Sequence, residues 1–344
     1  MRHARLVPAA AGLLLYLASA CAAAAQELPR VRLVATGGTI SNRTGGRLTA
    51  DELINLAPDV RRYARPEAEQ FSNTASSDLT LGQWLALSRR LNELYSTDAA
   101  LAGIVVTSGT DTLEELAYFL HLTVRDARPV VVVGSMRNPS TTGYEGAANL
   151  LEGFRVAATP EARGKGALVV LNDEINSARE VTKTDALRLQ TFQSRTTGVL
   201  GVVDPDRVVF YRSVVKRHTA ASEFDVSKIA ELPRVDVLLV YQGAPGDLIR
   251  AAVDLGAQGL VVAAAGAGAT SGTQSEGLAY AIGKGVTVVA TTRAGSGRIS
   301  GTRMFGAPFI GGEDLAPVKA RVLLMLALAA TRDPAEIQRM FLQY

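Results

Sequence analysis

The chain of 344 residues has one cysteine, Cys21, and only three histidines. Cys21 lies in a leader-like N-terminal segment, so the rest of the chain has no residue for a disulfide, a thiolate nucleophile or a cysteine metal ligand. His121 and His218 are the only histidines beyond that segment. So small a number of histidines disfavours a metal site or a Ser-His-Asp triad. His121 falls at helical spacing and is interpreted as a helix-face residue.

Charge of one sign and long apolar runs are also scarce. Removing the two arginines of the leader leaves 34 of the 36 basic residues against 33 acidic ones, a net charge near +1. Nucleic-acid binding is not expected, because no extended basic patch stands out. After the leader, no segment reaches the roughly 18 uninterrupted apolar residues of a membrane span. The remaining length, roughly 320 residues, suffices for one or two hydrophobic cores.

Residues 1–25 have the pattern of a secretory signal peptide. A positively charged start (2–5) precedes an apolar stretch (10–20) and an Ala-x-Ala cleavage motif (23–25). The mature chain is therefore expected to be exported to the periplasm and to be soluble, without a membrane anchor. A lipoprotein cleaved before Cys21 is the alternative, because the preceding residues match a lipobox imperfectly.

Short valine-rich runs alternate with stretches of helical periodicity. Runs of this kind are typical of strands buried on both faces of a parallel sheet, with helices covering the faces. The predicted strands are 31–35, 103–107, 130–134, 167–171, 235–241, 259–264 and 286–291. The predicted helices are 80–95, 112–122, 247–255, 275–284 and 317–330.

The alternation of strands and helices breaks off in an irregular, partly basic stretch that ends at Pro233. We therefore predict an α/β fold of two domains with mostly parallel sheets. The larger N-terminal domain, 26–212, would be catalytic. A linker, 213–233, leads to a smaller C-terminal domain, 234–344.

A glycine-rich turn, Ala-Thr-Gly-Gly-Thr-Ile at 35–40, follows the first predicted strand. Ligands of open α/β sheets bind beyond the carboxyl ends of the strands, where Thr36 and Thr39 are expected. Gly37 and Gly38 allow a sharp turn and leave amide N–H groups for a developing oxyanion. A hydroxyl here can attack a carbonyl carbon if a base removes its proton. The alternative is that both threonines are ordinary turn or capping residues.

A second turn, Thr-Ser-Gly-Thr-Asp-Thr at 107–112, follows another predicted strand. It offers the Thr110 hydroxyl beside the Asp111 carboxylate at the start of a helix. Asp111 can bind a substrate ammonium or orient a lysine, and helix capping by Asp111 or Ser108 is compatible with either role.

Lys183, in Val-Thr-Lys-Thr-Asp, is a candidate general base. A lysine acts as a base only when neutral, a state that burial or the nearby charge of Arg179 would favour. The alternative is a solvated loop lysine.

These motifs, together with Val-Val-Val-Val-Gly-Ser-Met-Arg at 130–137, resemble those of bacterial type II L-asparaginases and glutaminase-asparaginases. The resemblance covers nearly all of the mature chain. Further similarity lies at 172–173, 179–184, 216–218, 224–228 and 319–328. It implies a two-domain α/β homotetramer, a dimer of dimers, that hydrolyses the side-chain amide of asparagine and sometimes glutamine. It also implies that the enzyme uses no metal or organic cofactor.

The resemblance also assigns roles to individual residues. Thr36 matches the nucleophile that forms an acyl-enzyme. Thr110, Lys183 and Asp111 match a second triad that activates the attack or the water, and Thr110 and Asp111 also contact the substrate. Ser76 matches the residue that binds the substrate α-carboxylate, and Ser77 beside it is also predicted to contact the substrate.

Other positions depart from the family pattern. Ser77 stands where the family often has glutamine. The lid segment, 41–48, is short, and Arg43 stands in the place of a tyrosine that hydrogen-bonds the first threonine. Gly-Ala-Gly-Ala at 266–269 replaces a turn with asparagines, and no glutamate within 294–306 matches the family's intersubunit acid. The preference for asparagine over glutamine is therefore left open.

Two other functions share features with this sequence. A dinucleotide site would use the glycines that begin at Gly266, but their spacing is G-x-G-x-x-x-G and no acid ends the next strand. A periplasmic amino-acid-binding protein of the same fold, with weak or no turnover, would explain the altered lid. It would not explain the joint presence of Thr36, Thr110, Asp111 and Lys183.

Overall fold

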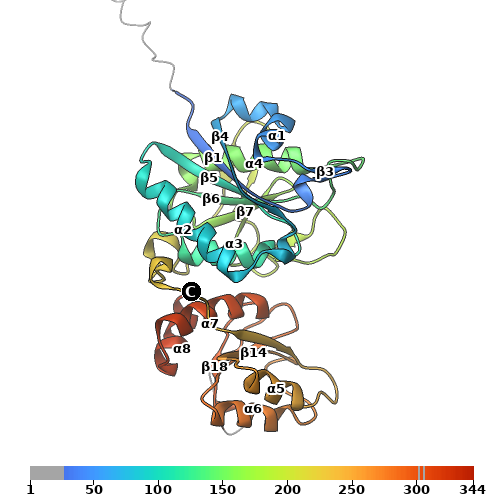
Figure 1. Ribbon diagram of the computed structural model, residues 1–344, viewed down its shortest axis with the longest axis vertical. Helices are drawn as coiled ribbons and strands as arrows, with labels where there is room; N and C mark the ends of the chain where they lie inside the picture. Colours follow the sequence, from blue (N-terminus) through green and yellow to red (C-terminus); the bar gives the residue numbers. More distant parts are fainter. Residues whose placement is uncertain (1–26, 301–302, 305–306) are drawn as a thin grey trace, which may run out of the picture.

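The computed structural model describes residues 27–300, 303–304 and 307–344. The predicted signal peptide, with Cys21 and the alternative cleavage site, lies outside the described residues. Two separate sheets lie one above the other, and helices surround each (Figure 1). The prediction of two mostly parallel α/β sheets, the N-terminal one larger, is confirmed.

The N-terminal sheet has eight strands in the order β12-β11-β8-β7-β6-β5-β1-β4. Neighbours from β4 to β7 are parallel, and the three pairs from β7 to β12 are antiparallel. The strands are β1 (Arg30–Gly37), β4 (Arg65–Thr74), β5 (Leu101–Thr107), β6 (Val130–Val133), β7 (Ala167–Leu171), β8 (Glu174–Ser177), β11 (Gly201–Val203) and β12 (Val208–Phe210). The glycine-rich turn at 35–40 and the second turn at 107–112 therefore follow neighbouring parallel strands, β1 and β5.

Buried valines build the centre of this sheet because helices cover both of its faces. In β6, Val130 and Val132 enter one hydrophobic core, whereas Val131 and Val133 enter another. Helices α2 and α3 supply the first core, and α1 and α4 supply the second. These helices are α1 (Ala50–Leu56), α2 (Leu81–Thr97), α3 (Leu113–Thr123) and α4 (Gly146–Ala158).

Two of these helices begin with reciprocal capping boxes. Thr49 accepts from Glu52 N–H while the Glu52 side chain accepts from Thr49 N–H, and Thr80 and Gln83 repeat the arrangement at α2. Such caps satisfy donors that the first turn of a helix leaves free. The residues next to the start of α1 and of α2 thus specify where these helices begin.

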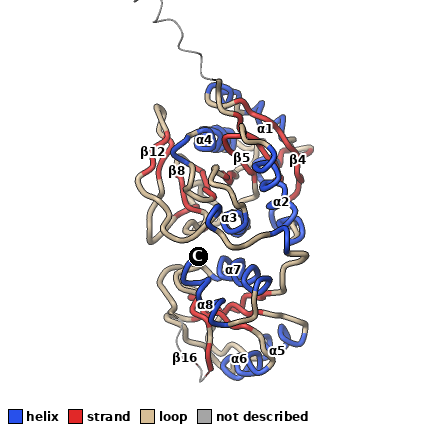
Figure 2. The backbone as a smooth tube through the Cα atoms, turned by 90° about the vertical axis from the view of Figure 1, so that its left-hand side faces the viewer, coloured by secondary structure: helices blue, strands red, loops and turns tan. Residues whose placement is uncertain are grey.

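The C-terminal sheet has four parallel strands in the order β13-β14-β15-β18. They are β13 (Val235–Leu239), β14 (Gly259–Ala264), β15 (Thr287–Thr292) and β18 (Ile310–Gly311). Helices α5 (Asp247–Asp254) and α6 (Gln274–Gly283) cover one face, and α7 (Pro317–Ala330) and α8 (Pro334–Gln343) cover the other. Helix α7 also packs against α3 of the upper sheet, so one hydrophobic core spans both sheets (Figure 2).

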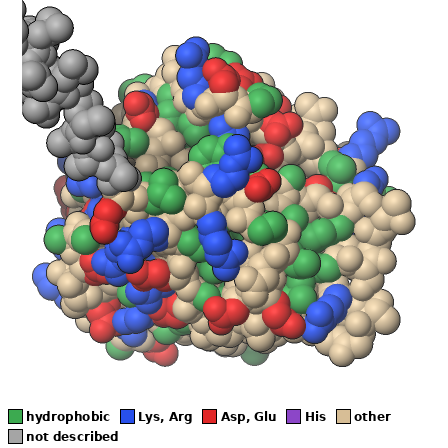
Figure 3. Space-filling model, turned by 90° about the horizontal axis from the view of Figure 1, so that it is seen from above, with side chains coloured by type: hydrophobic (Ala, Val, Ile, Leu, Met, Phe, Trp, Pro, Cys, Tyr) green, Lys and Arg blue, Asp and Glu red, His purple; other side chains and the backbone are tan. Residues whose placement is uncertain are grey.

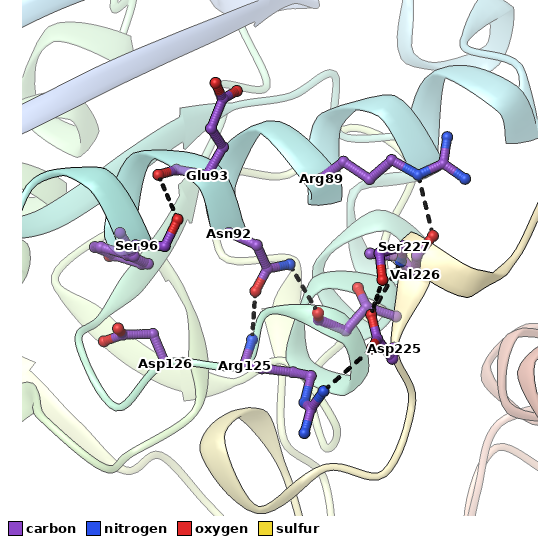
Figure 4. Close-up of a pocket in the computed structure, with 11 residues that line it drawn as sticks. Arg89, Asn92, Glu93, Ser96, Arg125, Asp126, Asp225, Val226 and Ser227 are labelled. Carbon is purple, nitrogen blue, oxygen red and sulfur yellow. Dashed lines mark hydrogen bonds and ion pairs between the residues drawn. The ribbon is translucent and has the colours of Figure 1, made fainter.

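The segment between the two sheets is anchored on the N-terminal side. Its 3-10 turn Val226–Lys228 lies against α2, where Arg89 Nε donates to the Val226 carbonyl at 3.0 Å. Arg125 forms an ion pair with Asp225 at 3.5 Å beside it (Figure 4). The connection therefore runs over the surface of the upper part before the chain enters β13.

The strands and helices named from the sequence are all present, with ends shifted by a few residues. The sequence did not predict the helices α1, α4 and α8, nor the strands β4, β8, β11, β12 and β18 of the two large sheets. On the face seen in Figure 3, basic and acidic side chains are intermixed. Within the described part of the chain, no helix is long and apolar enough to cross a bilayer.

His121 lies on α3, as predicted, but it is fully buried. Its Nδ1 accepts from the Ala167 backbone N–H at 3.2 Å, and its ring centroid lies 5.0 Å from that of His218. Burial lowers the pKa of His121 well below its usual value, and it lowers the pKa of His218 as well. Both rings are therefore neutral in the folded protein near pH 6.5.

This histidine pair should make the fold sensitive to acid. A neutral buried histidine stabilises the fold above its unfolded-state pKa, near 6.5, and the stabilisation is lost as pH falls through the folded pKa. Each such histidine contributes at most about 1.4 kcal/mol per pH unit. Denaturant titrations from pH 7.5 to pH 5 should therefore show a falling free energy of unfolding. The slope should be shallower in His121→Asn, which keeps an acceptor for Ala167, and an unchanged slope would contradict this role.

Candidate active site

The turns that follow β1 and β5 touch each other through two glycines. Gly38 has a φ of +89°, and a Cβ added to it would overlap the backbone of Gly109. A Cβ on Gly109 would in turn lie 2.7 Å from Ser76 Oγ. The absence of side chains at both glycines thus lets three segments meet at the carboxyl end of the sheet.

The glycine turn does not leave both of its amides free. Gly38 N–H donates to the Thr74 carbonyl of β4 at 2.8 Å. The expectation that Gly38 offers a free donor for an oxyanion is therefore wrong in this conformation, because the edge strand already uses that amide.

Thr36 lies inside the sheet, with 1% of its surface exposed. Its Oγ1 donates to the Thr107 carbonyl at 2.6 Å, and its backbone N–H donates to Thr107 Oγ1 at 3.2 Å. β1 extends through Gly37, so Thr36 is still a strand residue. A buried hydroxyl whose proton is committed to a carbonyl argues against Thr36 as the attacking group.

Thr39 has the opposite environment. It is the first residue of the 3-10 turn Thr39–Ser41 and is partly exposed beyond the end of β1. The next residue, Ile40, is fully buried, and its carbonyl accepts from Tyr144 Oη at 2.9 Å. The buried Ile40 side chain and the hydrogen bond from Tyr144 thus fix the turn, while Thr39 remains accessible.

The structure brings Thr110, Asp111 and Lys183 together. Lys183 Nζ lies 3.1 Å from Thr110 Oγ1 and 2.7 Å from Asp111 Oδ1. The Lys183 side chain is only 16% exposed, whereas that of Asp111 is 78% exposed. A solvated loop lysine is therefore excluded. The trio presents a hydroxyl, an amine and a solvent-facing carboxylate within hydrogen-bonding distance.

The short strand β9 (Thr182–Lys183) carries the lysine and pairs with β10 (Phe192–Gln193). Glu114 of α3 accepts from Lys183 N–H at 3.2 Å and from Thr182 Oγ1 at 3.0 Å. Glu114 is not among the site residues predicted from the sequence. No spacing along the chain signals its contacts, because its partners lie 68 and 69 residues further on.

Arg179 does not face Lys183 as expected. Its guanidinium binds Asp314 of the C-terminal part at 2.6 and 2.9 Å, and its Nε donates to the Tyr344 carbonyl at 2.6 Å. Tyr344, the last residue, is fully buried. Arg179 therefore joins the segment before Lys183 to the end of the chain.

The two predicted substrate-binding serines differ in exposure. Ser76 is 6% exposed and packs against Gly109, whereas Ser77 is exposed on the same 3-10 turn, Ser76–Asp78. Ser76 is thus next to the turn that carries Thr110, and Ser77 faces solvent.

The segment predicted to be a lid, 41–48, forms a small hairpin of β2 (Asn42–Arg43) and β3 (Gly46–Arg47). Arg43 forms an ion pair with Glu52 of α1 at 3.2 Å. The neighbouring Arg47 is the one that reaches the glycine turn, with Nη1 3.3 Å from the Gly38 carbonyl. The side chain of Arg43 is therefore engaged with α1, away from the turn.

Over the described residues, no three or more His, Cys, Asp or Glu side chains gather closely enough to hold a metal ion.

Comparison with known proteins identifies close relatives over nearly the whole chain. The family model "Asparaginase, N-terminal" matches residues 30–216, and "Glutaminase/Asparaginase C-terminal domain" matches residues 234–341. L-asparaginase 2 of Bacillus subtilis is 41% identical, with 95% of this chain and 90% of the relative covered. Glutaminase-asparaginase of Pseudomonas fluorescens is 35% identical, with 98% of each covered. A crystal structure titled probable cytoplasmic L-asparaginase from Campylobacter jejuni has a TM-score of 0.87 and 40% identity, covering 92% of this chain and all of that one.

The contact between the two glycine turns can be tested with a matched pair of substitutions. Gly38 and Gly45 have similar φ angles, +89° and +86°, but nothing lies within 4 Å of a Cβ on Gly45. Gly38→Ala should destabilise the protein by about 2 kcal/mol or more, from strain plus collision, and should separate the turns. Gly45→Ala should cost only the strain, about 1 kcal/mol. Equal losses in denaturant unfolding would show that close approach at Gly38 is unimportant.

Proposed function

The chain belongs to the asparaginase family, and we propose that it is an exported amidohydrolase that releases ammonia from L-asparagine, with L-glutamine as a second substrate. The reaction would pass through a threonyl ester. The observation that carries the proposal is the Lys183 amine held against Thr110 and Asp111, beside a glycine turn that ends in an accessible threonine.

We assign the attacking hydroxyl to Thr39 in place of Thr36. Thr39 is partly exposed at the end of the turn, whereas the Thr36 hydroxyl is buried and bonded to Thr107. Attack by Thr39 on the amide carbon and cleavage of the C–N bond would give a threonyl ester and ammonia. Water would then cleave the ester, releasing the acid and restoring the hydroxyl. Thr36 serves as a link between β1 and β5.

Thr110, Lys183 and Asp111 form the second catalytic group of this proposal. Lys183, when neutral, can accept a proton from Thr110 or from the attacking water, and Thr110 Oγ1 already lies 3.1 Å from its Nζ. Asp111 orients the amine at 2.7 Å, and its exposed carboxylate is available to the α-ammonium of a substrate. Ser76, next to Gly109, and the exposed Ser77 that follows it are assigned to the substrate α-carboxylate.

The remaining parts of the proposal concern location and assembly. Export to the periplasm rests on the signal-peptide pattern of residues 1–25, and the solved relative is titled cytoplasmic. The catalytic domain is assigned to 26–212 and the smaller domain to 234–344, joined by 213–233. A homotetramer is proposed because the family resemblance implies one.

Ammonia release from both amides by the purified mature protein tests the reaction. Thr39→Ala and Thr110→Ala should each lower kcat by about 1,000-fold or more, because each removes a group that acts on the reacting atoms. Thr36→Val should leave measurable turnover but destabilise the fold by about 1–3 kcal/mol, since the Thr107 carbonyl loses its donor.

Two results would overturn these assignments. An active Thr39→Ala beside an inactive, folded Thr36→Val would return the nucleophile to Thr36. Stabilisation of the protein by amino acids, without ammonia release, would favour a binding protein of this fold.

A further inference from the structure

Lys183 is held through its backbone from one side by Glu114. The carboxylate of Glu114 accepts from Lys183 N–H at 3.2 Å and from Thr182 Oγ1 at 3.0 Å. Glu114 belongs to α3, which begins at Leu113, two residues after Asp111. The turn that carries the groups that Lys183 meets therefore leads directly into the helix that carries the group that fixes its backbone.

A second charged group holds the same segment from the C-terminal part. Lys319 of α7 is 1% exposed, and its Nζ donates to the carbonyls of Ala178 at 2.9 Å, Arg179 at 3.1 Å and Val181. These carbonyls belong to the stretch that leads directly into β9. An ammonium that satisfies three backbone carbonyls fixes the path of that stretch, because each unsatisfied buried carbonyl would cost free energy.

Glu114 and Lys319 also face each other, with Nζ 3.9 Å from Oε2. Among the described residues, Glu114 Oε2 is buried without a hydrogen-bond partner, and the Lys319 ammonium is the positive charge that lies near it. The two side chains thus form one charged clamp on residues 178–183, with one member on each side of the interface between the sheets. Removing the Lys319 charge leaves the Glu114 carboxylate buried without its counter-charge.

We propose that Glu114 and Lys319 are positioning residues that hold the Lys183 amine against Thr110 and Asp111, so that the C-terminal part completes the active site of its own chain. The inference rests on the proposed function of Lys183. The side chain of a lysine is long and flexible, so the direction of its amine depends on a fixed backbone. A displacement of about 1 Å at a reacting group can cost about 100-fold in rate.

The same two helices offer a matched control. Glu115, the next residue of α3, forms an ion pair with Arg321 of α7 at 3.7 Å, and Arg321 Nε donates to the Val235 carbonyl at 2.9 Å. This pair also crosses the interface between the sheets, but within the described residues neither side chain forms a hydrogen bond or ion pair with residues 178–183. Substitutions in the Glu115–Arg321 pair therefore show the effect of removing a charge from the interface while the Glu114–Lys319 clamp stays intact.

The test compares Lys319→Met and Glu114→Gln with Arg321→Met and Glu115→Gln in the full-length mature protein. Steady-state kinetics should show kcat lower by about 10- to 100-fold in the first pair, with KM within about threefold of wild type. The control pair should stay within about twofold. Hydrogen exchange followed by mass spectrometry should show faster exchange across 178–183 in the first pair only.

A double substitution separates positioning from a general structural effect. Because Lys319 acts through Lys183, Lys319→Met should cost nothing further in kcat when added to Lys183→Met. An additive loss would overturn the proposal, as would a loss in Arg321→Met equal to that in Lys319→Met. If Lys319→Met fails to fold, the nearly isosteric Glu114→Gln decides the matter by the same criteria.

Failure of the proposed function is distinguishable from failure of this inference. If the wild-type protein releases no ammonia from either amide, the proposed function fails, and the exchange measurement alone judges the clamp. Equal exchange of residues 178–183 in wild type, Lys319→Met and Glu114→Gln would then overturn it.

Discussion

The parallel pairing of β1 with β5 is the constraint on which the site depends. The register places Ala35 opposite Thr107, so the two strands end at the same level and their turns leave the sheet side by side. Thr36 locks this register, because its hydroxyl and its amide both bond to Thr107. Gly38 then lets the first turn rest on Gly109 of the second. The pairing of β1 with β5 therefore determines how the two turns lie relative to each other, and with them the side chains of the site.

The sequence predicts the strands well where the residue types themselves indicate burial. Four consecutive valines, Val130–Val133, predict a strand between two hydrophobic cores, and the structure places them there. β4 was missed because its alternating acids look solvated, whereas Glu67 and Glu69 pair with Arg32 of the neighbouring β1. α4 was missed because glycines interrupt its pattern. A Cβ on Gly153 would lie 2.6 Å from a valine of β6, so the helix needs glycine to approach the sheet.

The candidate site was predictable in its parts but not in its details. The two turns and Lys183 stand out by residue chemistry, and the structure places them together. The choice between Thr36 and Thr39 depends on where β1 ends, and spacing does not report that a strand continues to Gly37. The contacts of Lys319 could not be foreseen, because they join segments far apart in the chain. Patterns along the sequence describe neighbours in an element and say little about such distant pairs.

The burial of Tyr344 has a consequence for local fluctuations. Its carbonyl accepts from Arg179 Nε and its hydroxyl accepts from the backbone N–H of Glu223, and the end of α8 lies between the two layers in Figure 1. Arg179 belongs to the loop that leads to Lys183, so α8 and this loop share a bond although they lie far apart in the chain. A local opening that frees α8 should therefore loosen the loop of the lysine as well.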